Sequence, residues 1–338
     1  MYQSSRPESP EAATRPSGRG AHLRHNTPRV TEHSVSAERL HFAWDNSLAP
    51  LLEIDPGDTV TVETWDSSGH FYTPASTSAD VARRRSEPAR GHALTGPIAI
   101  RGARPGQTLV VDVLEVAPAA WGFTTFAPGR GLLPDDFSRP YLRIWDLSDG
   151  AQARGVADVR VPLAPFCGVM GVAPAEPGSH STAPPRRVGG NMDVRQLTAG
   201  STLYLPIEVD GALFSVGDAH GAQGDGEVCI TAIEMDSTSR LRFSLSDQAV
   251  REPQLRLDRP PTTIAGAYHG CTAHAPDLME AARNATRYLI DWLAREAKIS
   301  PEDAYVLSSV AAELRISQVV DAPNWTVTAF FPLALLGP

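Results

Sequence analysis

Side chains able to bind a metal ion are concentrated between residues 218 and 227. Asp218, His220, Gln223, Asp225 and Glu227 place three carboxylates, an imidazole and an amide within ten residues. Carboxylate and imidazole together are the ligands of a zinc-like site that keeps one position open for water. The simpler interpretation is a polar, glycine-rich loop with one surface histidine. The residue types and spacing alone leave both interpretations open.

The elements that must position these side chains are two apolar runs, 212–217 and 228–235, on either side of the polar segment. Both runs are typical of strands, and the glycines between them permit unusual backbone conformations. The sequence therefore predicts a site hairpin over residues 212–236. Alternate residues of an extended chain point to the same side, so Asp218 and His220 are expected to converge on one ion.

Six segments of the chain resemble the acetamidase/formamidase family, in the family's order, from about residue 35 to the end. They are 166–174 (FCGVMGVAP), 189–193 (GGNMD), 200–206 (GSTLYLP), 211–228 (GALFSVGDAHGAQGDGEV), 282–291 (ARNATRYLID) and 315–325 (RISQVVDAPNW). The resemblance implies an amidohydrolase that cleaves formamide, acetamide or a close analogue to a carboxylate and ammonia.

Amide hydrolysis needs a nucleophile, a group that stabilises the oxyanion and an acid for the departing ammonia. Cys167 and Cys229 lie in apolar runs typical of a protein core, so neither resembles an activated thiol. The chain has no Gly-x-Ser-x-Gly motif, and its one lysine, Lys298, is near the end of a predicted helix. The remaining route is a water molecule activated by a divalent metal, with zinc as the first candidate.

The predicted metal ligands are Asp193, Asp218 and His220, with Glu63 and Asp66 as alternates from the N-terminal half. Glu63 and Asp66 form the acidic end of a predicted strand, and the family resemblance favours this strand end as part of the site.

The predicted catalytic residues are Glu227, Asn191 and Gln223. Glu227 is assigned as the general base or a further ligand, because a buried carboxylate beside a metal must serve one of these purposes. Asn191 and Gln223 are assigned as hydrogen-bonding groups around the ligands or beside the oxyanion. Other histidines, including His92, are interpreted as surface or structural residues.

The predicted fold is mainly β, with a β-sandwich or barrel-like core and a small C-terminal α/β part, because strands outnumber helices and are joined by short turns. Residues 1–33 are expected to form a disordered tail, followed by a β-rich half over 34–160 and a second half over 161–338. Apolar residues at a 3.6-residue spacing predict a helix over 277–297, and a serine cap followed by proline predicts another over 300–314.

The composition of the chain argues against several classes of partner and location. The 338 residues carry a net charge of −9, which argues against a nucleic-acid partner. The chain has no apolar run of about 18 residues and no hydrophobic signal core, so no membrane association is expected. Three widely spaced cysteines favour a reducing compartment, and we expect a cytoplasmic homodimer or higher homo-oligomer.

Two alternatives to a short-chain amidase stay open at this point. One is a homologue that acts on a larger or cyclic amide, because residues 117–150 and 174–188 could reshape the pocket. The other is a non-catalytic homologue that keeps the fold and a metal. The presence of the whole candidate ligand set favours an active enzyme.

Overall fold

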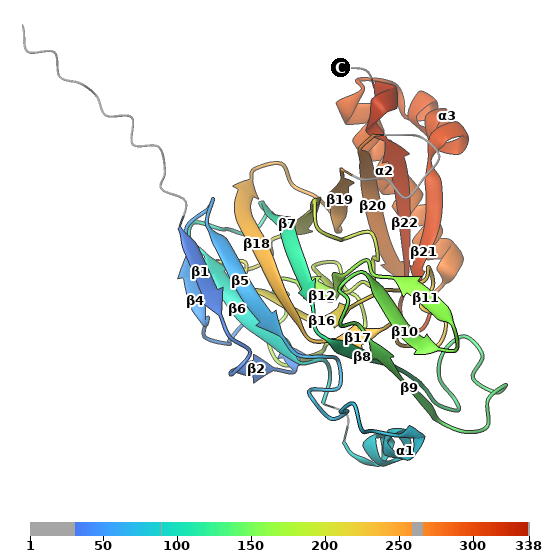
Figure 1. The fold of residues 1–338 in the computed structure, drawn as a ribbon. Helices are drawn as coiled ribbons and strands as arrows, with labels where there is room; N and C mark the ends of the chain where they lie inside the picture. Colours follow the sequence, from blue (N-terminus) through green and yellow to red (C-terminus); the bar gives the residue numbers. More distant parts are fainter. Residues whose placement is uncertain (1–30, 89, 259–265, 337–338) are drawn as a thin grey trace, which may run out of the picture.

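The computed structural model describes residues 31–88, 90–258 and 266–336, and most of this chain belongs to two large sheets (Figure 1). The first sheet has nine strands, in the order β1 (Glu32–Val35), β5 (Thr59–Thr64), β18 (Ser237–Ser246), β7 (Thr108–Pro118), β15 (Ser201–Pro206), β19 (Gln254–Leu257), β20 (Tyr268–Ala275), β22 (Trp325–Pro332) and β21 (Glu313–Gln318).

The second sheet has eleven strands. Eight follow the order β11 (Val159–Pro162), β10 (Gln152–Val156), β9 (Tyr141–Asp146), β8 (Trp121–Phe126), β17 (Glu234–Met235), β16 (Phe214–His220), β12 (Phe166–Gly171) and β14 (Gly189–Asn191). The other three are β6 (Leu94–Ile100), which pairs with β16, and β2 (Leu40–His41) and β4 (Leu52–Ile54), which pair with β6. A small separate sheet joins β3 (Ala43–Trp44) to β13 (His180–Ser181).

The main hydrophobic core is built from residues of both sheets. Val62 and Leu241 come from the first sheet and Val216 from the second, and all three are fully buried. The rings of Phe214 and Phe243, one from each sheet, lie 5.1 Å apart in an edge-to-face arrangement. The predicted mainly β architecture is confirmed, with the core filled from two facing sheets.

The two halves expected from the sequence share both sheets. In the first sheet β18 pairs with β5 and β7, and in the second sheet β6 pairs with β16. The expected boundary after residue 160 falls inside β11. Of the expected tail, residues 1–30 lie outside the described residues, while β1 already begins at Glu32.

Helices cover the C-terminal strands. α2 (Leu278–Glu296) packs on β20 and β22, and the side chain of Asp277 caps it by accepting from the Glu280 N–H at 2.8 Å. α3 (Pro301–Ala311) follows with Ser300 as its cap. A short helix, α1 (Ser78–Ser86), lies at the opposite end of the molecule, and a single 3₁₀ turn, η1 (Leu333–Leu336), ends the described chain (Figure 1).

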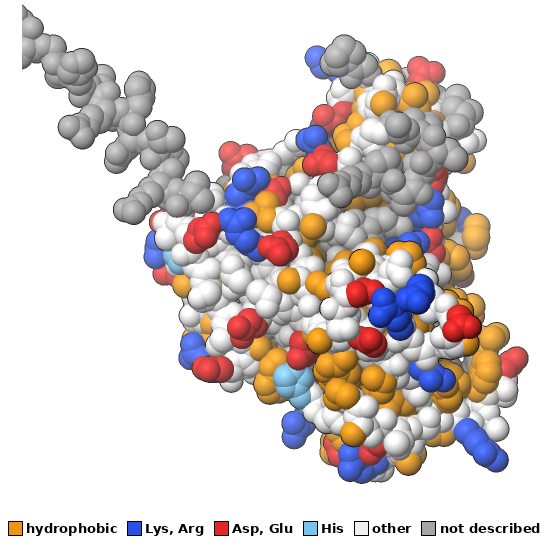
Figure 2. Space-filling view, viewed as in Figure 1, with side chains coloured by type: hydrophobic (Ala, Val, Ile, Leu, Met, Phe, Trp, Pro, Cys, Tyr) orange, Lys and Arg blue, Asp and Glu red, His pale blue; other side chains and the backbone are white. Residues whose placement is uncertain are grey.

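The helix predicted over 300–314 is too long. It ends at Ala311, because Ala312 adopts an extended backbone and the chain enters β21 at Glu313. Pairing with β22 keeps residues 313–318 extended. No helix among the described residues is long and apolar enough to cross a membrane. On the face drawn in Figure 2, acidic and basic side chains are interspersed.

Candidate metal centre

β16 carries two of the predicted ligands through the middle of the second sheet. All seven residues of this strand are buried, and it pairs with both β12 and β6. Asp218 has a left-handed φ of 55°, so the strand is locally irregular at this residue. Asp218 Oδ1 nevertheless lies 3.5 Å from His220 Nε2, as the predicted convergence of the two side chains requires.

The second strand of the predicted hairpin is much shorter than expected. Only Glu234 and Met235 pair with β16, and Glu234 lies directly opposite His220. Residues 228–233 are irregular because Glu227 and Ile230 adopt left-handed φ values of 48° and 82° and close successive turns. The predicted strand over residues 228–235 is therefore wrong except at Glu234 and Met235, and Glu227 lies in the loop before them.

His220 is the centre of a cluster of buried side chains that also contains Asp193, Asp218, Glu227 and Glu234. Its Nε2 lies 3.3 Å from Glu234 Oε1 in addition to its contact with Asp218, and its Nδ1 lies 2.9 Å from Gln223 Oε1. Gln223 Nε2 donates to the backbone carbonyl of Asp193 at 2.9 Å, which fixes the orientation of the amide. Because Gln223 Oε1 can only accept, Nδ1 carries a proton, so Nε2 is the nitrogen that faces the two carboxylates and would bind a metal after losing its own proton.

Asp193 reaches the cluster from the segment after β14. It has a left-handed φ of 49°, and its Oδ1 lies 3.9 Å from His220 Nδ1. A Cβ at Gly168 on β12 would lie 2.5 Å from this oxygen, so the glycine makes the close approach possible. Glu227 completes a group with Asp193 and His220 whose ligand atoms lie within 4.8 Å of one another.

Three residues of the cluster were not predicted as part of the site. Glu234 forms a second group with Asp218 and His220, again with ligand atoms within 4.8 Å. Asp321 lies close enough for its charge to raise the pKa of Asp193, and His92 Nε2 lies 3.9 Å from Asp218 Oδ2. Two signals could have found the acids: Glu234 is the acidic residue within an apolar run, and Asp321 lies inside the family-like segment 315–325.

The cluster places more negative charge in the protein interior than its own hydrogen bonds satisfy. Asp193, Asp218, Glu227 and Glu234 are at most 7% exposed. Buried atoms without a hydrogen-bond partner include both carboxylate oxygens of Asp193 and one atom each of Asp218, His220, Glu234 and Asp321. Buried carboxylates are costly unless a proton or cation neutralises them. The donor set of carboxylate oxygens and one imidazole nitrogen therefore fits a divalent cation.

The pKa shifts within the cluster show the same need for positive charge. Burial raises the pKa of Asp193 and Glu227 well above the usual range, that of Glu234 to about 7 and that of Asp321 to about 6. Burial alone would lower the pKa of His220, but the negative charges of Glu234 and Asp218 outweigh burial and raise this pKa well above its usual value. Without a metal, the cluster thus retains protons where a cation could bind.

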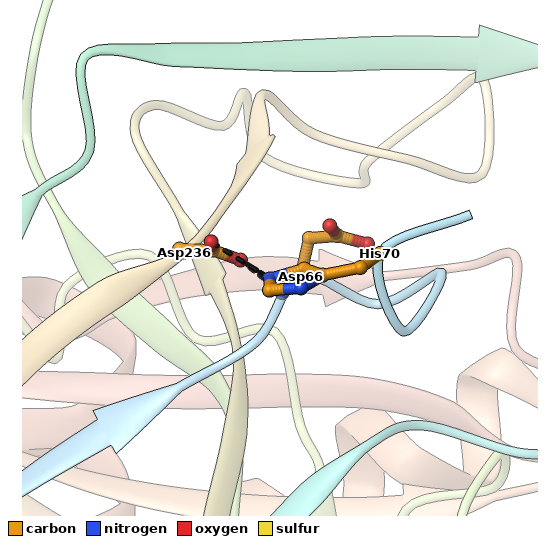
Figure 3. Close-up of side chains that lie close together, drawn as sticks. All are labelled: Asp66, His70 and Asp236. Atoms are coloured by element: carbon orange, nitrogen blue, oxygen red, sulfur yellow. Dashed lines mark hydrogen bonds and ion pairs between the residues drawn. The ribbon is translucent and has the colours of Figure 1, made fainter. Parts of the chain in front are cut away.

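The alternates Glu63 and Asp66 do not join this cluster. Glu63 is exposed, and Asp66 lies with His70 and Asp236 in a separate group (Figure 3). In that group His70 Nε2 lies 2.8 Å from Asp236 Oδ2, while Asp66 accepts from Ser68. These groups satisfy one another, in contrast to the buried cluster. The prediction that the alternates meet the other ligands is wrong, because Glu63 lines a separate surface pocket of about 250 Å³ and Asp66 lies beside two residues of that pocket, His70 and Asp236.

Asn191 and Cys167 lie in the buried interior around the cluster. Asn191 Nδ2 donates to the Ala183 carbonyl at 2.9 Å, and its Oδ1 is buried without a partner. Burial raises the pKa of the Cys167 thiol to about 11, so this residue is not an activated nucleophile.

The chain is similar in sequence and in structure to known formamidases and acetamidases. The model of the Acetamidase/Formamidase family matches residues 29–177 and 175–337. A formamidase from Methylophilus methylotrophus is 28% identical over 362 residues, covering 87% of this chain and 88% of that protein. The crystal structure of an acetamidase from Bacillus halodurans has a TM-score of 0.82 at 31% identity, covering 90% of this chain and 100% of that chain. A gamma lactamase from Delftia acidovorans has a TM-score of 0.62 at 25% identity, covering 91% and 95%.

Proposed function

Because the chain belongs to the acetamidase/formamidase family, we propose that it hydrolyses short-chain carboxamides, such as formamide and acetamide, to carboxylate and ammonia. The observation that carries this proposal is the buried cluster around His220, in which several carboxylate oxygens and the Nε2 atom of His220 lack hydrogen-bond partners. The formamidase and acetamidase relatives favour a small linear amide over a larger or cyclic one, since the gamma lactamase aligns less closely.

Asp218, His220 and Glu234 would hold a divalent ion, with zinc as the first candidate and Asp193 as a further ligand beside them. A bound ion of this kind polarises an amide carbonyl and lowers the pKa of water to about 7. Gln223 accepts from Nδ1 of His220 and so keeps Nε2 facing Asp218 and Glu234, where the ion would be held.

Glu227 is our candidate for the general base. It would take the proton of the attacking water and pass it to the departing nitrogen. Burial raises the pKa of Glu227 well above its usual range, which makes this carboxylate a stronger base.

Asn191 and Gln223 are assigned to positioning rather than to direct contact with the oxyanion. Asn191 Nδ2 already donates to the Ala183 carbonyl, and Gln223 Nε2 already donates to the Asp193 carbonyl. Gln223 Nε2 also donates to the Ser317 carbonyl at 3.4 Å, so both of its N–H groups are used. We assign both side chains to fixing the segments that carry Asp193 and His220.

The test is ammonia release by the purified protein over formamide, acetamide, propionamide and a γ-lactam. We expect turnover of the linear amides, loss of activity and of bound metal in His220→Ala, and neither loss in the control Asp66→Asn. Full activity and metal content in His220→Ala would overturn the proposed site. Turnover of the lactam alone would overturn the proposed substrate class.

We also propose a homo-oligomer in the cytoplasm. The free cysteines Cys167, Cys229 and Cys271 are consistent with a reducing compartment, and light scattering tests the subunit number.

A further inference from the structure

Gln318, the last residue of β21, forms hydrogen bonds that fold the following turn back onto itself. It is fully buried. Its Oε1 accepts from the backbone N–H groups of Val320 and Asp321, at 2.9 and 3.0 Å. Its Nε2 donates to the Asn324 carbonyl and to Thr326 Oγ1, at 3.0 and 3.1 Å. All four bonds join one side chain to residues 320–326.

This turn carries Asp321, the acidic residue that the C-terminal part of the chain contributes to the cluster. Asp321 Oδ2 is buried without a hydrogen bond. Because Gln318 binds the backbone N–H of Asp321 itself, the position of this carboxylate depends directly on the glutamine amide.

The same end of β21 also holds the loop that carries Glu227. Gly226 forms a parallel bridge with Gln318, donates to the Ser317 carbonyl at 3.2 Å and accepts from Val319 at 3.3 Å. A register shift between Ile316 and Gln318 sets Ser317 out of the regular pairing with β22. Two segments of the site therefore meet at the end of β21: the turn around Asp321 through the side chain of Gln318, and the loop before Glu227 through the backbone of Ser317 and Val319.

We propose that Gln318 is a positioning residue for amide hydrolysis, whose side chain places Asp321 beside Asp193; this rests on the proposed function. An apolar side chain of equal length would leave two buried N–H groups and one carbonyl without their partner. The turn would have to shift to recover hydrogen bonds, and Asp321 would shift with it. Among the described residues, Gln318 forms no hydrogen bond with Asp218, His220 or Glu234, so their hold on a metal should survive.

The test compares Gln318→Met with the full-length wild type. We expect the Val320 and Asp321 amides to exchange with solvent about 10-fold faster or more, because their acceptor is gone. We expect kcat on acetamide to fall by roughly 10–100-fold, as is typical when a residue supporting a metal site is lost. KM should stay within about twofold and metal content should be unchanged, because substrate binding and the ligands are retained.

Gln107→Met is the matched control, since Gln107 also secures a turn, through the Arg104 N–H and Asp247, but contacts no residue of the cluster. Thr326→Val removes one of the four bonds and serves if Gln318→Met does not fold; we expect the same changes at a smaller size. Unchanged amide exchange in the folded variants, or faster exchange with unchanged kcat, would overturn the proposal. An inactive wild type would instead overturn the proposed function, while amide exchange would still report on the positioning.

Discussion

At the scale of single residues, the pattern Asp218-x-His220 was sufficient to predict that two side chains converge. The pattern could not predict the carboxylate opposite His220, because Glu234 is placed there by the pairing of β16 with β17. It also could not predict the direction of the His220 lone pair, which depends on an amide fixed by the backbone of Asp193. Predicting these features requires the tertiary structure.

The roles of the two glutamates can be separated by isosteric amides. We expect Glu234→Gln to lower divalent-metal affinity by more than the roughly 10–100-fold typical of a residue that only supports a ligand. We expect Glu227→Gln to keep the metal and lose about 10²–10⁴-fold in kcat, as for a lost general base. Metal analysis and ammonia release on the same preparations measure both. The reverse pattern would make Glu227 the ligand and Glu234 the base.

At the scale of elements, the regular strands and α2 were predictable from alternation, helical periodicity and the Asp277 cap. The errors fell where local sequence and tertiary pairing disagree. The β-branched run 228–233 forms turns instead of a strand, and residues 313–314 leave the predicted helix because β22 pairs with them. The separation of Asp66 from the cluster could not be predicted either, because it depends on where the sheet places the segment that follows β5.

The close packing of β12 against the site gives a test at this scale. Gly168→Ala would place a Cβ 2.5 Å from Asp193 Oδ1 and 2.8 Å from His220 Cε1. We expect at least about a 10-fold loss of metal affinity, with hydrolysis lost in parallel, because the ligands are displaced. Gly221→Ala is the control, since its Cβ would meet only ordinary contacts from 3.4 Å. Wild-type metal affinity in Gly168→Ala would contradict the described geometry.

At the scale of the whole molecule, the cluster depends on chain segments far apart in sequence. Asp193, His220 and Asp321 come from three separate segments, and the two sheets each combine strands from the N- and C-terminal halves. A family-like order of motifs predicted that these segments belong to one protein, but only the fold brings them together.

Because the halves share both sheets, we predict that they cannot fold separately. Cleavage in the exposed segment 132–139 by limited proteolysis should leave two fragments that stay associated and keep the metal. The physical reason is that β18 lies between β5 and β7, so separation would expose strands on both sides. Two fragments that separate and each fold, without loss of metal, would contradict the shared core.

Acid stability should depend on a buried histidine. Burial lowers the pKa of His269, which stacks on Trp292, from 6.5 to about 3. The unfolded chain then binds more protons between these pH values, so stability falls as the pH drops from 6.5 toward 3, by about 1.4 kcal/mol per pH unit. We expect His269→Phe, which keeps the ring stacking, to reduce the slope by about this amount. Denaturant unfolding at several pH values measures it; an unchanged slope would contradict the assignment, and the region above pH 7 is the internal control.

The most direct test of the central claim is a metal titration of the wild-type protein. The protein is stripped with a chelator and reloaded stepwise with zinc, and bound metal and ammonia release from formamide and acetamide are measured at each step. The claim predicts that hydrolysis disappears with the metal and returns in proportion to the metal bound by the His220 cluster, with no return in His220→Ala. Full hydrolysis by the metal-free protein, or equal recovery in His220→Ala, would contradict it.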